Sequence, residues 1–263
     1  MRNPLISPRK PIVYAIINHK GGVGKTTTTL NLARALSLLS NDVLMIDLDP
    51  QANLTQSVGL NESSRNITGT LCRNEKLPII EIYDTLHLVP SDLSLATAEM
   101  SLQAEHLLGY TKLKKALDTV KNQYDYVLID CPPSLGILPI NAIIAADEVI
   151  IVTQAEYLAI TGTKTILELC EKLKEAMNEK LQIAGILFTQ VDNTVVSKGI
   201  IAAMRKEYKE QIFDAVIRRT VGLKEASIQR VDIFKYKHES AGAKDYLALA
   251  CEVFKIPNIT LPE

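Results

Sequence analysis

The sequence predicts an α/β fold in which a doubly wound, mostly parallel sheet is flanked by helices. Short apolar runs rich in Ile and Val alternate with segments of helical periodicity, and several runs lack the polar alternation of a half-exposed strand. Its 263 residues, 47% of them hydrophobic, suit one large α/β domain or two small ones. We expect a single domain over residues 1–263, with a leader at 1–10 and a tail at 255–263.

These patterns place the individual elements. The apolar runs predict strands at Ile12–Ile17, Val43–Ile46, Leu86–Val89, Tyr126–Ile129, Glu148–Val152 and Ile183–Phe188. Weaker strand candidates are Ile212–Ile217 and Ile233–Tyr236. Helical periodicity predicts helices at Thr27–Leu39, Thr111–Lys121, Thr163–Met177, Lys198–Glu210 and Lys244–Phe254. The polar stretch from Asn61 to Pro78 predicts a short helix and a surface connection.

Composition excludes several classes of protein. A net charge of −1 does not favour binding to polyanions through overall charge. The four cysteines are scattered without a C-x-x-C pair, so neither a zinc site nor a disulfide framework is indicated. We find no signal peptide and no apolar run of about 18 residues, so we expect a cytoplasmic protein without a membrane partner. About ten residues precede the first strand, so we expect no helix-turn-helix module before it.

A glycine-rich run follows the first expected strand. Residues 20–27 read Lys-Gly-Gly-Val-Gly-Lys-Thr-Thr and lead into the first expected helix. Glycines let backbone N–H groups converge on an anion at a helix N-terminus. Lys25 can reach the outer phosphates of a nucleotide, and the Thr26 hydroxyl can ligate Mg²⁺. The run departs from the usual G-x-x-x-x-G-K-[ST] pattern, because His19 stands at the first glycine position and an extra lysine, Lys20, precedes the glycine pair.

Carboxylates follow two other expected strands. The run Val43-Leu-Met-Ile ends in Asp47-Leu-Asp49-Pro, and Tyr126-Val-Leu-Ile ends in Asp130-Cys-Pro-Pro. In an open parallel sheet such ends lie beside the phosphate loop, where a nucleotide hydrolase needs carboxylates near Mg²⁺ and the attacking water. The second run has the Walker B pattern, whose Asp binds Mg²⁺ through water. The two prolines after it predict a switch loop.

These segments together resemble the ParA/MinD group of P-loop ATPases, and its ParA/Soj partition branch in particular, from about Ile12 to Val253. The motifs K-G-G-V-G-K-T-T, D-x-D-P-Q and D-C-P-P-S carry the likeness. The resemblance implies ATP and Mg²⁺, weak ATP hydrolysis stimulated by a ParB-like DNA-binding partner, and an ATP-sandwich homodimer. It also implies binding to nonspecific double-stranded DNA and association with the nucleoid.

The resemblance also implies roles for single residues. Lys20 would reach the phosphates of the other subunit, and Gly21 would lie at the dimer seam. Lys25 would hold the β and γ phosphates, Thr26 would ligate Mg²⁺, and Thr27 would contact the α phosphate. The loop is completed by Gly22, Val23 and Gly24.

Outside the loop, the resemblance implies that Asp49 orients or polarises the attacking water. Asp47 and Asp130 would support the Mg²⁺ shell. Arg219, within the run Ile217-Arg-Arg-Thr220, would lie near the adenine, although the family usually has Pro-Arg-Asn there.

DNA binding needs Lys and Arg on one face against phosphates. Residues 198–238 hold ten Lys/Arg and five Asp/Glu, a net charge of +5, while the remainder of the chain carries −6. The candidates are Lys198, Arg205, Arg218, Arg219 and Lys224. Family members usually carry arginines at the positions of Gly222 and Asn193-Thr194, and we expect the candidates to replace them.

Three alternatives stay open. The same kind of ATPase can position a protein cargo instead of DNA. A MinD-like ATPase would position proteins on a membrane, although the tail shows no basic amphipathic helix. An iron–sulfur reductase of the nitrogenase-iron-protein type would need two cysteines per subunit, with Cys131 as one candidate.

Overall fold

The computed structural model describes residues 10–60 and 65–255, so the leader and most of the tail lie outside the described residues. The strands are β1 Ile12–Ile17, β2 Val43–Asp47, β3 Ile80–Tyr83, β4 Leu86–Val89, β5 Tyr126–Asp130, β6 Glu148–Gln154, β7 Gln182–Val191 and β8 Ile212–Arg218. The longer helices are α1 Lys25–Leu38, α4 Ser94–Ala104, α6 Ile137–Ala145, α7 Ala159–Ala176, α8 Val195–Tyr208, α9 Val221–Ile228 and α11 Ala241–Val253. Shorter ones are α2 Asn53–Ser57, α3 Ile67–Arg73, α5 Lys112–Asp118 and α10 Ile233–Lys237.

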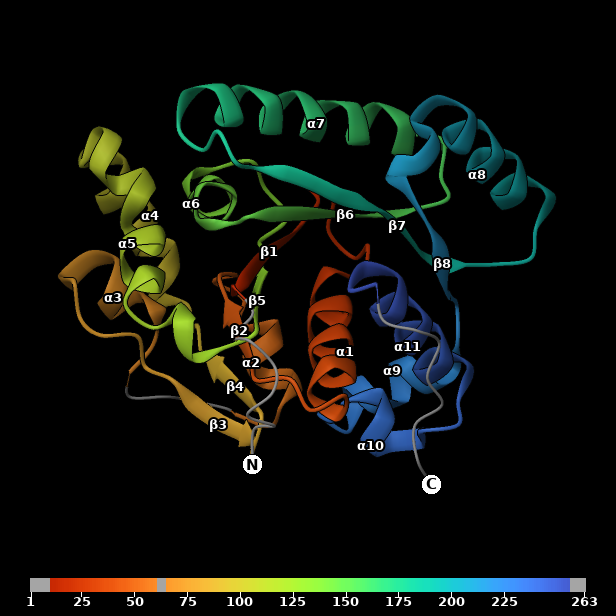
Figure 1. Cartoon of the computed structure of the whole chain (residues 1–263), viewed down its shortest axis with the longest axis horizontal. Coiled ribbons are helices and arrows are strands. Elements are labelled where there is room, and N and C mark those ends of the chain that lie inside the picture. The colour runs from red at the N-terminus through yellow and green to blue at the C-terminus, as the bar shows by residue number, and fades with distance from the viewer. Residues whose placement is uncertain (1–9, 61–64, 256–263) are drawn as a thin grey trace.

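The described strands form one sheet in the order β3-β4-β2-β5-β1-β6-β7-β8 (Figure 1). Neighbours pair in parallel except at one edge, where β3 and β4 are antiparallel. The central strand β1 has β5 on one side and β6 on the other, so the sheet extends in both directions from β1. The doubly wound, mostly parallel α/β fold is confirmed.

One strand prediction is wrong. Residues 233–236 lie in helix α10, because the Asp232 side chain accepts a hydrogen bond from the Lys235 N–H and so caps a helix. Ile233 and Phe234 are the buried residues of this short helix. The sequence reasoning also missed the edge strand β3 and the helices α4, α6 and α9. The short helix expected between Asn61 and Pro78 is α3, and residues 61–64 of that stretch lie outside the described residues.

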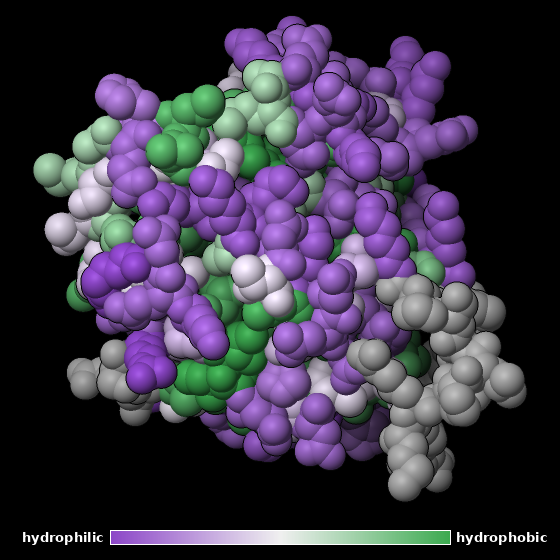
Figure 2. Space-filling model, turned by 60° about the vertical axis from the view of Figure 1, so that its left-hand side comes forward, coloured by the Kyte–Doolittle hydropathy of each residue, from purple (hydrophilic) through white to green (hydrophobic). Residues whose placement is uncertain are grey.

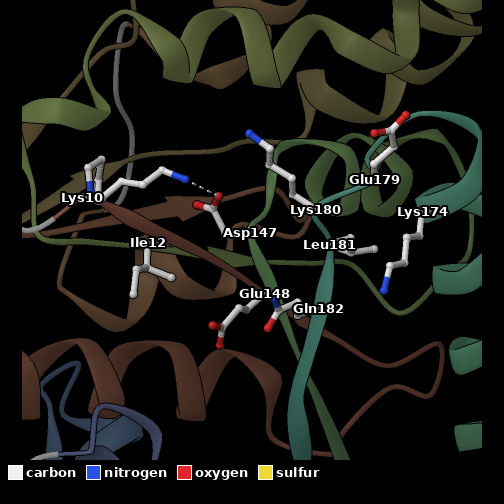
Figure 3. Close-up of a pocket in the computed structure, with 10 residues that line it drawn as sticks. Lys10, Ile12, Asp147, Glu148, Lys174, Glu179, Lys180, Leu181 and Gln182 are labelled. Carbon is white, nitrogen blue, oxygen red and sulfur yellow. Dashed lines mark ion pairs between the residues drawn. The ribbon is translucent and has the colours of Figure 1, made fainter.

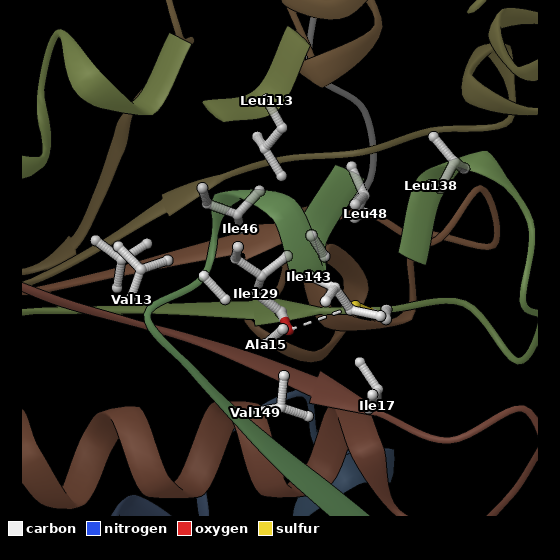
Figure 4. Packing of buried hydrophobic residues seen from close by; sticks show 14 of the residues in the cluster. Val13, Ala15, Ile17, Ile46, Leu48, Leu113, Ile129, Leu138, Ile143 and Val149 are labelled. Carbon is white, nitrogen blue, oxygen red and sulfur yellow. Dashed lines mark hydrogen bonds between the residues drawn. The ribbon is translucent and has the colours of Figure 1, made fainter. Parts of the chain in front are cut away.

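Both faces of the sheet are covered, which explains the unbroken apolar runs. Val13, Ala15 and Ile17 of β1 point into one core with side chains from α5 and α6 (Figure 4). Tyr14 and Ile16 point into the other core, with α1 and α11. The C-terminal ends of β1, β2 and β5 therefore meet at one protected edge, which is where the motif residues lie.

Candidate active site

The glycine-rich loop joins β1 to α1 in a conformation that needs glycine. Gly22 and Gly24 have φ of 75° and 93°, a region that other residues rarely adopt. α1 begins at Lys25, and the Thr28 N–H closes its first turn on the Gly24 carbonyl at 2.9 Å. The free N–H groups of this helix start, together with its dipole, favour an anion at the loop.

Residues from neighbouring strands hold this loop in place. The Gly22 carbonyl accepts hydrogen bonds from Gln190 Nε2 at 2.7 Å and from Gln154 Nε2 at 3.3 Å. The Thr189 hydroxyl donates to the Val23 carbonyl. Sequence reasoning missed Thr189 and Gln190 as site residues. The available signal was a polar pair late in an otherwise apolar strand.

Lys25 is a buried cation at the floor of the loop. Its Nζ donates to the Lys20 carbonyl at 3.1 Å. Burial lowers the pKa of Lys25, and the nearby Asp130 and Asp49 carboxylates partly oppose this. An anion bound in the loop would favour the charged ammonium, because opposite charge offsets the desolvation of a buried cation. This geometry fits the predicted phosphate-binding role.

Oxygen atoms that could hold a magnesium ion lie beside the loop. Asp47 and Asp130 face each other in the β2–β5 register and are fully buried, and Thr26 Oγ1 donates to Asp130 Oδ2 at 2.7 Å. Burial, and then the charge of Asp47, raises the pKa of Asp130 well above its ordinary value. A divalent cation would offset this charge. Hydroxyl and carboxylate oxygens are ligands that Mg²⁺ prefers, with phosphate and water completing its shell. Thr26 and Asp130 fit Mg²⁺.

Asp47 has a second set of contacts. Its carboxylate accepts from the Thr55 N–H at 2.8 Å, from the Thr55 hydroxyl at 2.7 Å and from the Asp49 N–H at 3.1 Å. Burial raises its pKa to about 6. These contacts fix the loop that carries Asp49, itself buried close to Lys25. Asp47 thus positions Asp49, and its part in the Mg²⁺ shell stays a prediction. Sequence reasoning missed Thr55.

The Lys20 side chain has its ion-pair partner outside the phosphate loop. Its Nζ forms an ion pair with Glu156, after β6, and both side chains are about half exposed. Gly21 is exposed, and a Cβ added there would come no closer than 3.8 Å to Pro133. Within one chain this position therefore tolerates a side chain. A requirement for glycine there would come from a second subunit.

A pocket of about 290 Å³ lies beside the loop. Gly24 and Thr27 form one wall, and Ile217, Arg219 and Leu223 contribute to the rest. The structure therefore brings the expected adenine segment next to the phosphate loop. A larger pocket, of about 450 Å³, lies on the opposite edge of the sheet, where charges of both signs include a Lys10–Asp147 ion pair at 4.0 Å (Figure 3). It is remote from the motif residues.

The five basic candidates do not form one patch. Arg218, Arg219 and Lys224 line the 290 Å³ pocket. Lys198 is exposed near the start of α8. Arg218 is tied to Asp245 by Nε and Nη2, at 3.0 and 2.6 Å. Arg205, near the other end of α8, pairs with Asp214 at 2.9 Å. Two of the three guanidinium groups among the candidates thus bind carboxylates of the same chain.

Comparisons with known proteins agree with this geometry. Over residues 12–183 the sequence matches the family model described as an AAA domain, and over 109–263 the one described as 4Fe-4S iron sulfur cluster binding proteins, NifH/frxC family. It is 37% identical to the sporulation initiation inhibitor protein Soj of Bacillus subtilis, over 92% of this chain and 97% of that protein. The chain belongs to the ParA/Soj family of P-loop ATPases.

Other relatives extend this result. The chromosome partitioning protein ParA of Myxococcus xanthus is 36% identical, over 92% of this chain and 88% of that protein. A cobyrinic acid a,c-diamide synthase of Mycobacterium smegmatis, solved with ADP and magnesium, superposes with a TM-score of 0.80 at 30% identity, covering 92% of this chain and 93% of that one. ATP and Mg²⁺ are the ligands of this ParA/Soj-family site.

An iron–sulfur cluster does not fit the cysteines. Cys131, Cys170 and Cys251, which lie in the range of the second family model, are buried. Burial raises the pKa of the Cys131 thiol well above its ordinary value, whereas cluster ligands are thiolates. A cluster shared between two subunits would need these groups at the surface. No helix within residues 10–60 and 65–255 is both long and apolar enough to cross a membrane.

Proposed function

We propose that this protein is a partition ATPase. In this scheme it closes into a face-to-face homodimer with ATP and Mg²⁺ and binds double-stranded DNA without sequence preference. Hydrolysis, stimulated by a ParB-like partner, then reopens the dimer. The observation that supports it most is the half-exposed Lys20, paired outside its own loop, beside the uncrowded Gly21, which suits a site completed by a second subunit. We further propose that it works at the nucleoid in the cytoplasm.

Each residue of the site would have its own role in the reaction. Lys25 and the loop N–H groups bind the phosphates, and Thr27 lies where the α phosphate would be held. Thr26 and Asp130 would hold Mg²⁺, which would supply positive charge to offset that of the phosphates. Asp49, held by Asp47, orients the attacking water. Lys20 from the second subunit stabilises the charge of the transition state, as an arginine finger does.

Dimerisation and hydrolysis test this scheme together. Light scattering should show a dimer only with ATP, and Asp49→Ala should keep that dimer while hydrolysis falls by about 10²–10⁴-fold, the usual contribution of a positioned acid or base. Lys20→Ala should bind ATP but not hydrolyse it. Lys180→Ala is the matched control, an exposed lysine on the opposite edge of the sheet. Hydrolysis by Asp49→Ala at the wild-type rate would show that Asp49 is misassigned.

Positioning of a protein cargo is the second candidate. It is favoured by the ion pairs of Arg205 and Arg218, which occupy two of the basic side chains. In addition, Thr194, whose hydroxyl caps α8, stands near the position where family members usually carry an arginine. A protein that dimerises with ATP but shows no DNA binding in any nucleotide state would support this function instead.

A further inference from the structure

Helix α4 and the 3-10 turn after it, η1 (His106–Thr111), have exposed apolar side chains. Another side of α4 is buried. Leu95, Ala98 and Leu102 of α4 pack into the core. Apolar side chains gather at the upper left of Figure 2, on the side of the molecule where α4 lies in Figure 1. The exposed members, which we call the α4 surface, are Leu93 (68%), Met100 (75%), Leu107 (67%) and Leu108 (59%).

The chain segment that carries the α4 surface is acidic, although Glu105 at the end of α4 pairs with Lys112 at 2.8 Å. Residues 77–111 contain five Asp/Glu and no Lys or Arg. Glu99 lies next to Met100 in sequence and has no cation within ion-pair distance among the described residues. Partial burial raises the pKa of Glu99. An apolar helical surface beside an uncompensated carboxylate is complementary to an amphipathic helix that carries Lys or Arg.

The α4 surface is joined to the catalytic edge. Glu99 Oε1 lies 3.7 Å from the position that a Cβ on Gly136 would occupy, at the end of the loop that follows Asp130. Asn141 of α6 is fully buried and donates to the Gly109 carbonyl of η1 at 2.8 Å, while its Oδ1 accepts from the Leu113 N–H at 3.2 Å. A helix docked on α4 would therefore press on the loop and the helix that follow the Walker B aspartate.

We propose that the α4 surface is the docking site for a basic amphipathic helix of the stimulating protein partner. This inference rests on the proposed partner-stimulated ATPase. Met100 and Leu107 supply the apolar contact, and Glu99 pairs with a cation of the partner. The acidic surroundings disfavour DNA here, because DNA is a polyanion. Docking acts on hydrolysis through Gly136 and Asn141.

Two model peptides test the surface directly. Both are 18-residue fluorescent helices with the same leucine face, and the other face is lysine in one and glutamate in the other. Fluorescence anisotropy with the full chain should show binding of the Leu/Lys peptide and much weaker binding of the Leu/Glu peptide. The double variant Met100→Ser/Leu107→Ser should weaken Leu/Lys binding by about 10-fold or more, as loss of two interface anchors does. Glu99→Gln should weaken it less.

The matched control is the double variant Val196→Ser/Ile228→Ser, which removes two equally exposed aliphatic side chains from α8 and α9. It should leave peptide binding unchanged. Equal weakening by both double variants, or by neither, would overturn the proposal. Concentration-dependent self-association of wild type that Met100→Ser/Leu107→Ser abolishes would assign the surface to a second copy and also overturn it.

Stimulated hydrolysis separates this inference from the proposed function. With a ParB-like partner, Met100→Ser/Leu107→Ser should keep the basal ATPase rate and lose the stimulation. Full stimulation of that variant would overturn the α4 proposal and leave the partition function standing. No stimulation of wild type would remove the partner from the proposed function, and the peptide measurement would then decide the α4 surface by itself.

Discussion

Two sides of the molecule, the centre of the sheet and the region around β8, use polar side chains in different ways. Around β1, β2 and β5, Lys25, Asp47 and Asp130 are buried, and hydrogen bonds to neighbouring groups fix them in place. Around β8, Arg205 and Arg218 are partly exposed and pair with carboxylates on other elements. Burial on the first side makes each charge costly until a nucleotide and Mg²⁺ arrive. Charge on the second side is largely neutralised already.

The largest expected effect is on nucleotide affinity at the buried side. Lys25→Ala removes a buried ammonium that would bind two phosphates, and charge-assisted hydrogen bonds contribute about 1.5–3 kcal/mol each. ATP affinity should therefore fall by roughly 100-fold or more, measured with a fluorescent ATP analogue. Lys20→Ala is the control, because this half-exposed lysine pairs with Glu156 outside the loop. Comparable losses in both variants would break the distinction between the two lysines.

The pH dependence of stability sharpens the same comparison. Asp47 has a pKa of about 6 in the folded chain against an ordinary value of 3.8, so the folded state retains its proton to higher pH than the unfolded state. The contribution of Asp47 to the free energy of unfolding is therefore greatest below pH 4. It falls by roughly 3 kcal/mol in total as the pH rises to about 6.

Urea unfolding without Mg²⁺ or nucleotide measures this loss between pH 4 and pH 6.5. Asp47→Asn cannot titrate, so the stability difference between wild type and this variant should change with pH in the stated direction. A difference that is constant with pH would show that Asp47 is ionised normally in the fold.

Arg218 should matter for stability more than for DNA. Its removal leaves Asp245, which is 9% exposed, with only the backbone N–H of residue 218 and no cation, and loss of hydrogen bonds to a charged group costs about 1–3 kcal/mol. Arg218→Ala should lower the free energy of urea unfolding by that amount. Arg219→Ala should leave it unchanged, because the structure places Arg219 on the open pocket wall. Equal stabilities of the two variants would contradict the structural role of the Arg218–Asp245 pair.

The smallest expected effect concerns DNA contacts. Arg219→Ala and Lys224→Ala should each weaken binding to any duplex and lower the slope of log affinity against log salt by about 1, the share of one phosphate contact. Arg205→Ala is the comparison, because Asp214 already pairs with it. A slope change for Arg205→Ala as large as for the other two would mean that the ion pair opens on DNA.

The same comparison explains what the sequence could predict. The phosphate loop, Asp130 and the strands around them were predictable, because glycines, buried runs and strand-end carboxylates act over a few neighbouring residues. Their contacts with Thr189 and Gln190 could not be foreseen, since those residues lie over 160 positions away in sequence. The partners of Arg205 and Arg218 depend on how β8 packs against α8 and α11. Residues 233–236 were misassigned because a short apolar run does not reveal its cap.

A DNA shift assay tests the central claim most directly. Asp49→Ala protein, which should hold ATP without hydrolysing it, is mixed with long nonspecific duplex at low salt without nucleotide, with ADP and with ATP. A nucleotide-gated DNA-binding dimer should give a shift only with ATP. No shift in any state, with ATP-dependent dimerisation still seen by light scattering, would contradict the proposed DNA binding and favour the positioning of a protein cargo.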